Sequence, residues 1–246
     1  MATTIHVGIG GWTYPPWRGL FYPEGLPQKR ELDHASRRLT SIEINGTYYS
    51  TFKPESWAKW RDATPPGFVF SVKGSRYCTN RKELAGAGDA VARFVGQGLG
   101  ELGDRLGPIN WQFMPSKKFD ASDVESFFKL LPREINGLPL RHAVEVRHSS
   151  FRDDRFYDLA RRYKIAIVIA DDGNFPLIEE PTADFTYARL MRTVDEIETG
   201  YSAADLDRWA RRAQDWARRG AVFVYFISGA KHRAPAAAEA LIRHLL

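Results

Sequence analysis

SIEINGTYY, residues 41–49, combines two features that are seldom found together in a buried strand. Ile42 and Ile44 alternate with Glu43 and Asn45, which is the period-2 pattern of a β-strand, and the glycine that follows predicts a turn. A carboxylate is costly to bury unless it is paired. Glu43 therefore indicates that one face of this strand has a special role.

A second stretch, HAVEVRHSS (142–150), repeats the pattern. Here Val144 and Val146 alternate with Glu145 and Arg147, so a glutamate again lies on the face opposite the aliphatic side chains. Two strands far apart in the chain thus carry the same unusual residue in the same relation to the apolar face.

Eight strand-like segments alternate with helical patterns along the chain. The predicted strands are 5–11, 41–48, 68–74, 108–114, 142–148, 165–172, 185–191 and 221–228. The strongest predicted helices are 82–102, 122–131, 153–163, 202–219 and 234–246, with capping signals at Ser122–Glu125 and Ser202–Asp205. Eight β units alternating with helices predict a parallel sheet, and we expect it to close as a (β/α)8 TIM barrel.

The length of 246 residues suits one such barrel. No Ser/Pro-rich linker, sequence repeat or low-complexity tract interrupts the chain, so residues 1–246 are predicted to form a single domain.

The two faces of the predicted strands differ sharply in chemistry. One set of alternate residues is strongly apolar and should face the helices. The other set is small, polar or charged and should face the barrel axis: His6, Gly8, Gly10, Glu43, Asn45, Ser71, Lys73, Asn110, Gln112, Glu145, Arg147, Tyr187, Arg189 and Tyr225. Residues late in barrel strands border the active-site mouth. We therefore expect the two glutamates to converge on one pocket.

Composition limits the setting and the partners. The net charge of +5 permits nucleic acid or another anionic partner without establishing one. A single cysteine, Cys78, excludes an intramolecular disulfide and fits a reducing, cytoplasmic location. Residues 1–11 show neither a basic leader nor a long apolar run, and the apolar stretches are strand-length, so we expect no signal peptide and no membrane contact.

Several motifs in the chain resemble one known family. They are Gly10-Gly11-Trp12-Thr13-Tyr14, Trp17-Arg18-Gly19, Phe21-Tyr22-Pro23, Glu43-Ile44-Asn45, Phe70-Ser71-Val72-Lys73, Glu145-Val146-Arg147-His148 and Tyr225-Phe226. In this order they resemble the YecE-like family, domain of unknown function 72. The resemblance implies a TIM barrel over essentially the whole chain, in agreement with the strand count, but it implies no defined activity.

The chain departs from that family's pattern near the predicted mouth. Ile227-Ser228-Gly229 stand where the family usually has an Asn pair and an Asp, and Met191-Arg192 stand where it often has His-Gly. Ser149 and Phe151 replace the usual Pro and Trp after His148. The first two changes remove polar groups, and with them any chemistry that relied on those groups.

Acid–base chemistry without a metal is the function favoured by the residue types. Glu43, Glu145 and Lys73 would shift one another's pKa values, and His148 is a natural proton carrier. This set predicts a lyase, isomerase or hydrolase acting on a small anionic or polyhydroxylated ligand. No organic cofactor is expected, because GIGG (8–11) is not a dinucleotide fingerprint.

Ligand contacts are expected from a second set of mouth residues. Arg147 and Arg189 suit a carboxylate or phosphate, whereas Trp12 and Tyr48 follow strand ends and suit a ring. The full predicted set is Trp12, Asn45, Tyr48, Gln112, Arg147, Arg189 and Tyr225.

Other interpretations remain open at this point. Glu43, Glu145, His148 and Asp171 or Asp172 could hold a divalent metal in a hydrolase or isomerase. The two glutamates could act as a retaining glycosidase pair. The chain could bind nucleic acid or another ligand without catalysis, or the charges could form a purely structural network.

Overall fold

The computed structural model describes residues 5–246. Its main sheet contains nine strands in the order β8-β7-β4-β3-β2-β1-β11-β10-β9, all paired in parallel. Their bounds are β1 Ile5–Gly10, β2 Ser41–Ile44, β3 Val69–Lys73, β4 Leu106–Gln112, β7 His142–Glu145, β8 Ala166–Ile167, β9 Ile169–Asp171, β10 Phe185–Leu190 and β11 Ala221–Phe226.

The ring of strands closes through the chain itself. β8 pairs with β7 and β9 pairs with β10, yet only Val168 separates β8 from β9. These two short strands are therefore the halves of one barrel strand, which matches the predicted segment 165–172. The eight predicted strands and the TIM-barrel prediction are confirmed.

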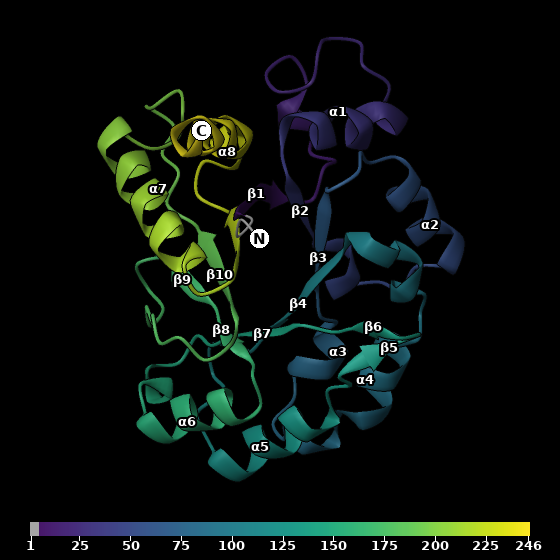
Figure 1. The fold of residues 1–246 in the computed structure, drawn as a ribbon, viewed down its shortest axis with the longest axis vertical. Coiled ribbons are helices and arrows are strands. Elements are labelled where there is room, and N and C mark those ends of the chain that lie inside the picture. Colours follow the sequence, from purple (N-terminus) through teal and green to yellow (C-terminus); the bar gives the residue numbers. More distant parts are fainter. Residues whose placement is uncertain (1–4) are drawn as a thin grey trace.

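Helices surround the ring on its outer side (Figure 1). They are α1 Glu31–Arg38, α2 Pro54–Asp62, α3 Arg76–Thr79, α4 Gly88–Val95, α5 Ala121–Leu130, α6 Asp154–Arg162, α7 Ala203–Ala217 and α8 Ala234–Leu245. Figure 1 shows α7 beside β9 and β10 and α8 nearer β1, while α5 and α6 lie at the opposite end from α1.

The predicted long helix over 82–102 is wrong. The chain instead forms a 3-10 helix at Leu84–Ala87, then α4, then a 3-10 segment at Leu99–Arg105. Gly98 and Gly103 adopt positive φ angles of 118° and 54°, which a continuous α-helix cannot contain. The apolar period in this stretch was correct, but its glycines break the helix.

A short hairpin was missed in the sequence. β5 (Glu134–Ile135) and β6 (Leu138–Pro139) pair antiparallel around Asn136-Gly137, whose φ angles are 50° and 77°. Asn-Gly between two short apolar segments is a strong hairpin signal. It lies outside the barrel and does not shape the mouth.

One of the two predicted helix caps is confirmed. Ser202 Oγ accepts a hydrogen bond from Asp205 N–H at 3.1 Å and begins α7. The prediction for Ser122 is wrong, because α5 begins two residues earlier: the Asp120 side chain accepts a hydrogen bond from Asp123 N–H at 2.9 Å.

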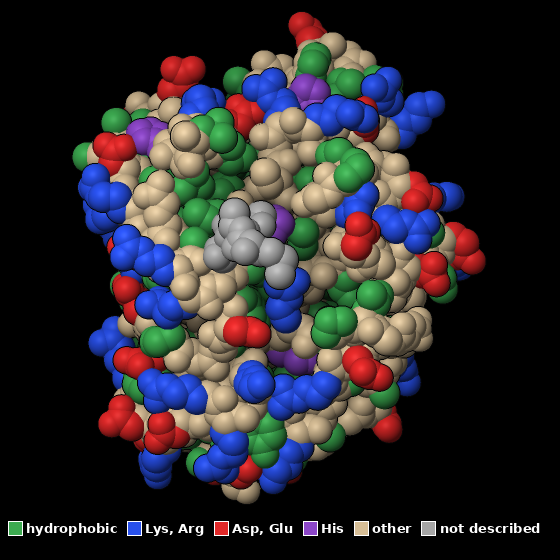
Figure 2. All heavy atoms as spheres, in the orientation of Figure 1, with side chains coloured by type: hydrophobic (Ala, Val, Ile, Leu, Met, Phe, Trp, Pro, Cys, Tyr) green, Lys and Arg blue, Asp and Glu red, His purple; other side chains and the backbone are tan. Residues whose placement is uncertain are grey.

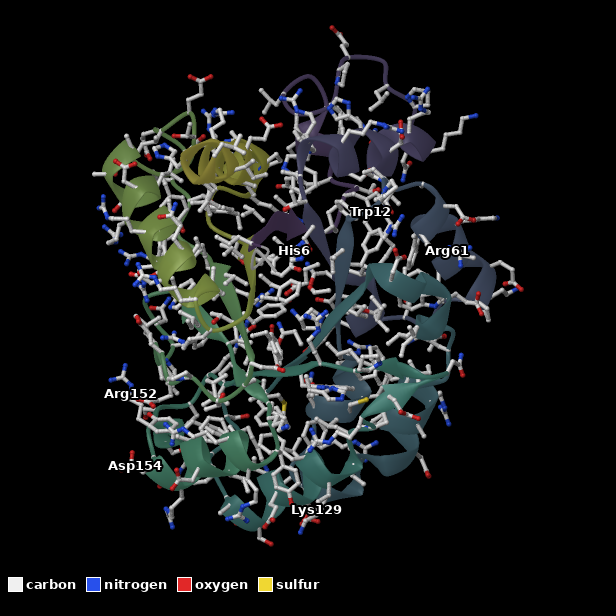
Figure 3. All side chains as sticks on the ribbon, in the orientation of Figure 1. His6, Trp12, Arg61, Lys129, Arg152 and Asp154 are labelled. Atoms are coloured by element: carbon white, nitrogen blue, oxygen red, sulfur yellow. The ribbon has the colours of Figure 1, made fainter. Side chains whose placement is uncertain are left out.

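Layers of side chains fill the barrel below its mouth. The His6 ring stacks on Phe223 at 5.0 Å, as Figure 3 places His6 within the ring of strands. Above it, Tyr225 bonds Ser41 at 2.7 Å and Tyr187 bonds Ser71 at 2.8 Å. The predicted inward face is thus correct here, and the filled interior limits ligand access to one end.

Charged side chains on the outer face seen in Figure 2 are mixed in sign, with Lys and Arg interspersed with Asp and Glu. Across residues 5–246, the helices are all too short or too polar to cross a bilayer.

Candidate active site

The carboxyl ends of five strands bring charged side chains together at the barrel mouth. Lys73, Gln112 and Glu145 end β3, β4 and β7, while Glu43 and Arg189 are the next-to-last residues of β2 and β10. Because parallel barrel strands end at the same face, their last inward residues meet there. The two glutamates do meet, as expected, but they meet at the Arg189 guanidinium, where both are fully buried, and not at the wall of an open pocket.

Arg189 joins the two carboxylates. Its Nη2 lies 3.0 Å from Glu43 Oε1 and its Nη1 lies 2.5 Å from Glu145 Oε2. Both glutamate side chains are fully buried, and that of Arg189 is 2% exposed. One guanidinium thus provides the countercharge that burial of each glutamate requires.

Two further groups hold the second oxygen of Glu43. Tyr187 donates its hydroxyl at 2.5 Å and Asn110 donates an amide hydrogen at 3.4 Å. Neither was among the predicted site residues, although both belong to the inward set that the strand alternation indicates. Burial, together with the Glu43 charge, raises the pKa of Tyr187 well above its usual value, so its hydroxyl remains a donor.

Arg147 extends the network toward the opening. It donates from Nε to Glu145 Oε1 at 2.8 Å and from Nη2 to Gln112 Oε1 at 2.9 Å. Phe175, which the sequence did not single out, packs under the guanidinium at 4.6 Å. The Arg147 side chain is 19% exposed and its Nη1 bonds none of residues 5–246, so it borders solvent.

The network keeps Glu145 ionised. Burial alone would raise its pKa, but Arg189, Arg147 and Lys73 together lower the pKa of Glu145 to about 2. A glycosidase acid needs a carboxyl with a raised pKa. The lowered pKa of Glu145 therefore argues against this residue as a glycosidase acid, and Arg189 faces the carboxylate of Glu43 as well.

Lys73 differs from the other charged residues of the mouth in its pKa and in its contacts. Burial lowers the pKa of Lys73 to about 8, with Arg189 adding to the effect and Glu43 and Glu145 opposing it. Its Nζ lies 4.8 Å from the centre of the Tyr48 ring. Within residues 5–246, this nitrogen takes part in none of the ion pairs or hydrogen bonds of the mouth.

Two predicted residues lie apart from this network. His148 caps the 3-10 helix Ser149–Phe151, its Nδ1 accepting from Ser150 N–H at 3.1 Å. No described hydrogen bond connects it to Glu43, Glu145 or Lys73. Tyr225 is fully buried below the mouth, bonded to Ser41, and so contributes to the barrel filling rather than to an open surface.

Beside the charged network lies an open groove of about 310 Å³. Its lining includes the predicted residues Trp12 and Asn45 but not Tyr48. Its lining is Gly10, Gly11, Trp12, Thr13, Ile44, Asn45, Gly46, Phe52, Trp60 and Lys231. Figure 3 shows Trp12 between the strands and α2, which supplies Trp60.

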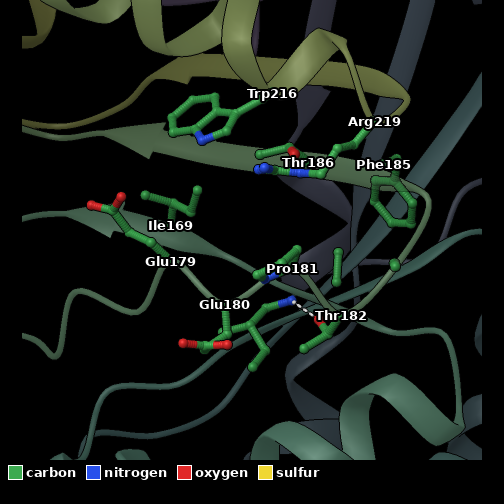
Figure 4. A pocket seen from close by; sticks show the side chains of 12 residues that line it. Ile169, Glu179, Glu180, Pro181, Thr182, Phe185, Thr186, Trp216 and Arg219 are labelled. Carbon is green, nitrogen blue, oxygen red and sulfur yellow. Dashed lines mark hydrogen bonds between the residues drawn. The ribbon is translucent and has the colours of Figure 1, made fainter.

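Another hollow lies far from these residues, where β8, β9 and β10 face the end of α7 (Figure 4). Its volume of about 20 Å³ is enough for roughly one water molecule. Thr182 Oγ1 there bonds Ile167 N–H at 3.2 Å. We assign this hollow a role in packing only.

The metal interpretation lacks a ligand cluster. Within residues 5–246, no three His, Cys, Asp or Glu side chains are grouped to hold an ion. Asp171 lies 3.7 Å from Arg192, and Asp172 caps the Asn174 N–H at 3.1 Å, so both have other partners. The oxygens of Glu43 and Glu145 are likewise taken by cationic and hydrogen-bonding groups.

Comparison with known proteins identifies the family. Residues 6–246 match the family described as protein of unknown function DUF72, so the chain belongs to the DUF72 family. The UPF0759 protein YecE of Escherichia coli K12 is 29% identical over 150 residues, which cover 60% of this chain and 50% of YecE. The aligned part thus spans about half the length of the curated relative.

Solved structures agree with the fold. A DUF72 family protein from Thermotoga maritima superposes with a TM-score of 0.75 at 25% identity, covering 97% of this chain and 96% of that one. A DUF72 family protein from Enterococcus faecalis V583 also gives 0.75, at 15% identity, covering 98% and 95%. A fusion protein described as a xylose isomerase-like TIM barrel gives 0.50 at 13% identity, covering 98% and 42%, and shows the barrel fold alone.

Proposed function

We propose that the chain is an enzyme that moves a proton on a small anionic substrate at the barrel mouth, with Lys73 as the base. The observation that carries the proposal is the pattern of pairing. Both buried carboxylates are matched to Arg189, whereas the ammonium of Lys73 is matched to no acid within hydrogen-bonding reach. A buried amine without a bonded acid contributes little to stability and is available for proton transfer.

The protonation state of Lys73 supports the same role. With its pKa lowered to about 8 by burial, about one tenth of the Lys73 side chain is a neutral amine at pH 7. A base with a pKa close to the working pH transfers protons efficiently. An ordinary exposed lysine would be almost fully protonated there and unable to accept one.

Arg147 is the group proposed to hold the anion. Its Nη1 is unengaged by the described residues, and the planar guanidinium can bind a carboxylate or phosphate. Glu43 and Glu145 then act by holding Arg189 and Arg147 in place and by keeping the mouth polar. His148 has no part in this proposal, because its Nδ1 bonds Ser150 and the residue lies apart from the charged network.

Proton exchange at carbon tests this proposal without knowledge of the full reaction. Lys73 Nζ would accept a proton from the carbon next to a carbonyl, leaving the electron pair as an enolate, and return a deuteron from D2O. We would follow deuterium incorporation by NMR into a panel of 2-oxo acids and keto phosphates, including pyruvate and dihydroxyacetone phosphate. Exchange should rise as pH increases through about 8, because the neutral amine is the base.

Lys73→Met should lose the exchange, since methionine fills similar space without a basic nitrogen. Lys118→Met is the matched control, because Lys118 is exposed on the loop after β4 and should leave the rate unchanged. Equal rates in wild type and Lys73→Met for every panel member would refute proton abstraction by Lys73.

Nucleic-acid binding is a second candidate function, supported by one surface feature. Tyr49 and Tyr77 are 63% and 61% exposed, and the Arg76 guanidinium lies 5.7 Å and 5.4 Å from their rings. Exposed aromatic rings beside a cation can stack unpaired bases. Fluorescence anisotropy with a single-stranded oligonucleotide should then show salt-dependent binding that Tyr77→Ala weakens; unchanged anisotropy would remove this candidate.

A further inference from the structure

We infer that the groove beside the charged network, lined by Trp12, Asn45, Phe52, Trp60 and Lys231, is a binding site for a planar aromatic ring carrying a carboxylate or phosphate. This site is separate from the proton-transfer role of Lys73, which does not line the groove. The inference rests on three features: the shape and size of the space, its aromatic walls, and its lone cation.

The space suits a small organic molecule. Its volume of about 310 Å³ lies at the lower end of the range for ligand pockets. Gly10, Gly11 and Gly46 contribute backbone without side chains, which leaves the space open. At Gly10, an added Cβ would lie 2.5 Å from Asn45 Nδ2 and 2.7 Å from Ile227 Cδ1, so a larger residue would disturb the lining.

Aromatic rings form one side of the groove. Trp12 and Trp60 meet edge to face at 5.2 Å, and Phe52 and Trp60 do so at 4.9 Å. Each ring thereby holds the next in a fixed orientation. A planar ligand ring can add to such a cluster by the same edge-to-face or offset contacts, which an aliphatic ring cannot reproduce.

Lys231 supplies the charge. Its Nζ lies 4.3 Å from the centre of the Tyr14 ring, and Trp17 Nε1 bonds its backbone carbonyl at 3.0 Å. The first contact places the ammonium over the Tyr14 ring, and the second holds the Lys231 backbone at the edge of the groove. Among residues 5–246, no carboxylate forms an ion pair with Lys231, so its charge is available to an anion that enters the groove.

The buried carboxylate of Glu43 does not compete with a ligand anion for the polar groups of the groove. Glu43 lies on β2, two positions before the groove residue Asn45, but its oxygens already face Arg189 and Tyr187. Asn45 Oδ1 accepts no hydrogen bond from the described residues. Its carboxamide can therefore turn toward a donor on the ligand without losing a bond.

Isothermal titration calorimetry with 4-hydroxybenzoate tests the site, with cyclohexanecarboxylate and phenol as matched controls for the ring and the charge. We expect one saturable site for 4-hydroxybenzoate, with affinity at least about tenfold above that of either control. Lys231→Met should weaken 4-hydroxybenzoate about tenfold and leave phenol unchanged. Trp12→Leu should reduce the preference for the aromatic ring over the cyclohexane ring.

Three outcomes would overturn the inference: no saturable binding of 4-hydroxybenzoate at millimolar concentration, equal affinity in wild type and Lys231→Met, or loss of binding in Lys73→Met. The last would place the anion in the charged network instead. Lys73→Met should therefore retain binding, which separates failure of this site from failure of the proton-transfer proposal. Lys118→Met controls for loss of a surface charge on the protein.

Discussion

Arg189 joins the two buried glutamates of the mouth, because its guanidinium faces both of them. Arg189→Met removes the countercharge while keeping much of the volume. We expect a loss of about 3–5 kcal/mol in the free energy of unfolding, which is typical when one partner of a buried ion pair is removed. Urea denaturation at pH 7 measures it.

Arg192→Met is the control for that change. Arg192 is 62% exposed, and its ion pair with Asp171 is long, at 3.7 Å. Its removal should therefore lower the free energy of unfolding by less than about 1 kcal/mol. Equal losses in the two variants would show that the glutamates do not depend on Arg189.

His142 makes the protein sensitive to acid. Burial lowers the pKa of His142 to about 4, although the Pro132 carbonyl, 2.7 Å from Nε2, opposes the effect. Its Nδ1 accepts a hydrogen bond from Trp111 Nε1–H at 3.1 Å. The unfolded state, with a pKa near 6.5, binds a proton first as the pH falls. Stability should therefore drop between pH 6.5 and 4, and burial of His6, whose pKa is also lowered to about 4, adds to the effect.

Denaturant unfolding of wild type and His142→Gln at pH 7.5 and pH 5 tests this prediction. The variant should lose stability at both values, but its difference between the two should be smaller than that of wild type. A pH-independent stability in wild type over this range would contradict it.

At the level of helices, the two predicted caps provide a paired test. Ser202→Ala removes the oxygen that begins α7 and should cost about 1 kcal/mol. Ser122→Ala should change the free energy of unfolding by less than about 0.5 kcal/mol, because Asp120 caps α5. Thermal or urea unfolding distinguishes them, and a larger effect at Ser122 would contradict the observed start of α5.

For the molecule as a whole, barrel closure predicts cooperative unfolding. β1 near one end of the chain pairs with β11 near the other, and β8 and β9 close the ring. We expect far-UV circular dichroism and tryptophan fluorescence to report one coincident transition, as for a single domain. Two separate midpoints would show independent units.

The sequence predicted the strands better than the helices and the residues that cap them. Alternation in a parallel barrel is strict, so Glu43, Glu145 and Arg189 could be placed on one face from period alone. The prediction of one continuous helix over 82–102 was wrong because the conformations of its glycines depend on tertiary packing. The choice between Asp120 and Ser122 as the cap of α5 depends on tertiary packing as well.

The contacts between side chains could not be predicted from the sequence, for a different reason. Tyr187 contacts Glu43, and Phe175 contacts Arg147, each from a segment far away in the sequence. Period-2 alternation predicts which face of the sheet a residue occupies but not which side chain it contacts. The same limit applied to His148, whose strand-end position gave no sign that Ser150 would hold its ring.

Titration of Lys73 is the most direct test of the account. NMR of lysine 13Cε or 15Nζ resonances would follow each side chain with pH, and Lys73→Met would assign the signal by its disappearance. Because burial disfavours the ammonium, we predict a midpoint near 8 for Lys73. A midpoint at the ordinary lysine value of about 10.4 would mean that the amine is protonated at neutral pH and would contradict its role as the base.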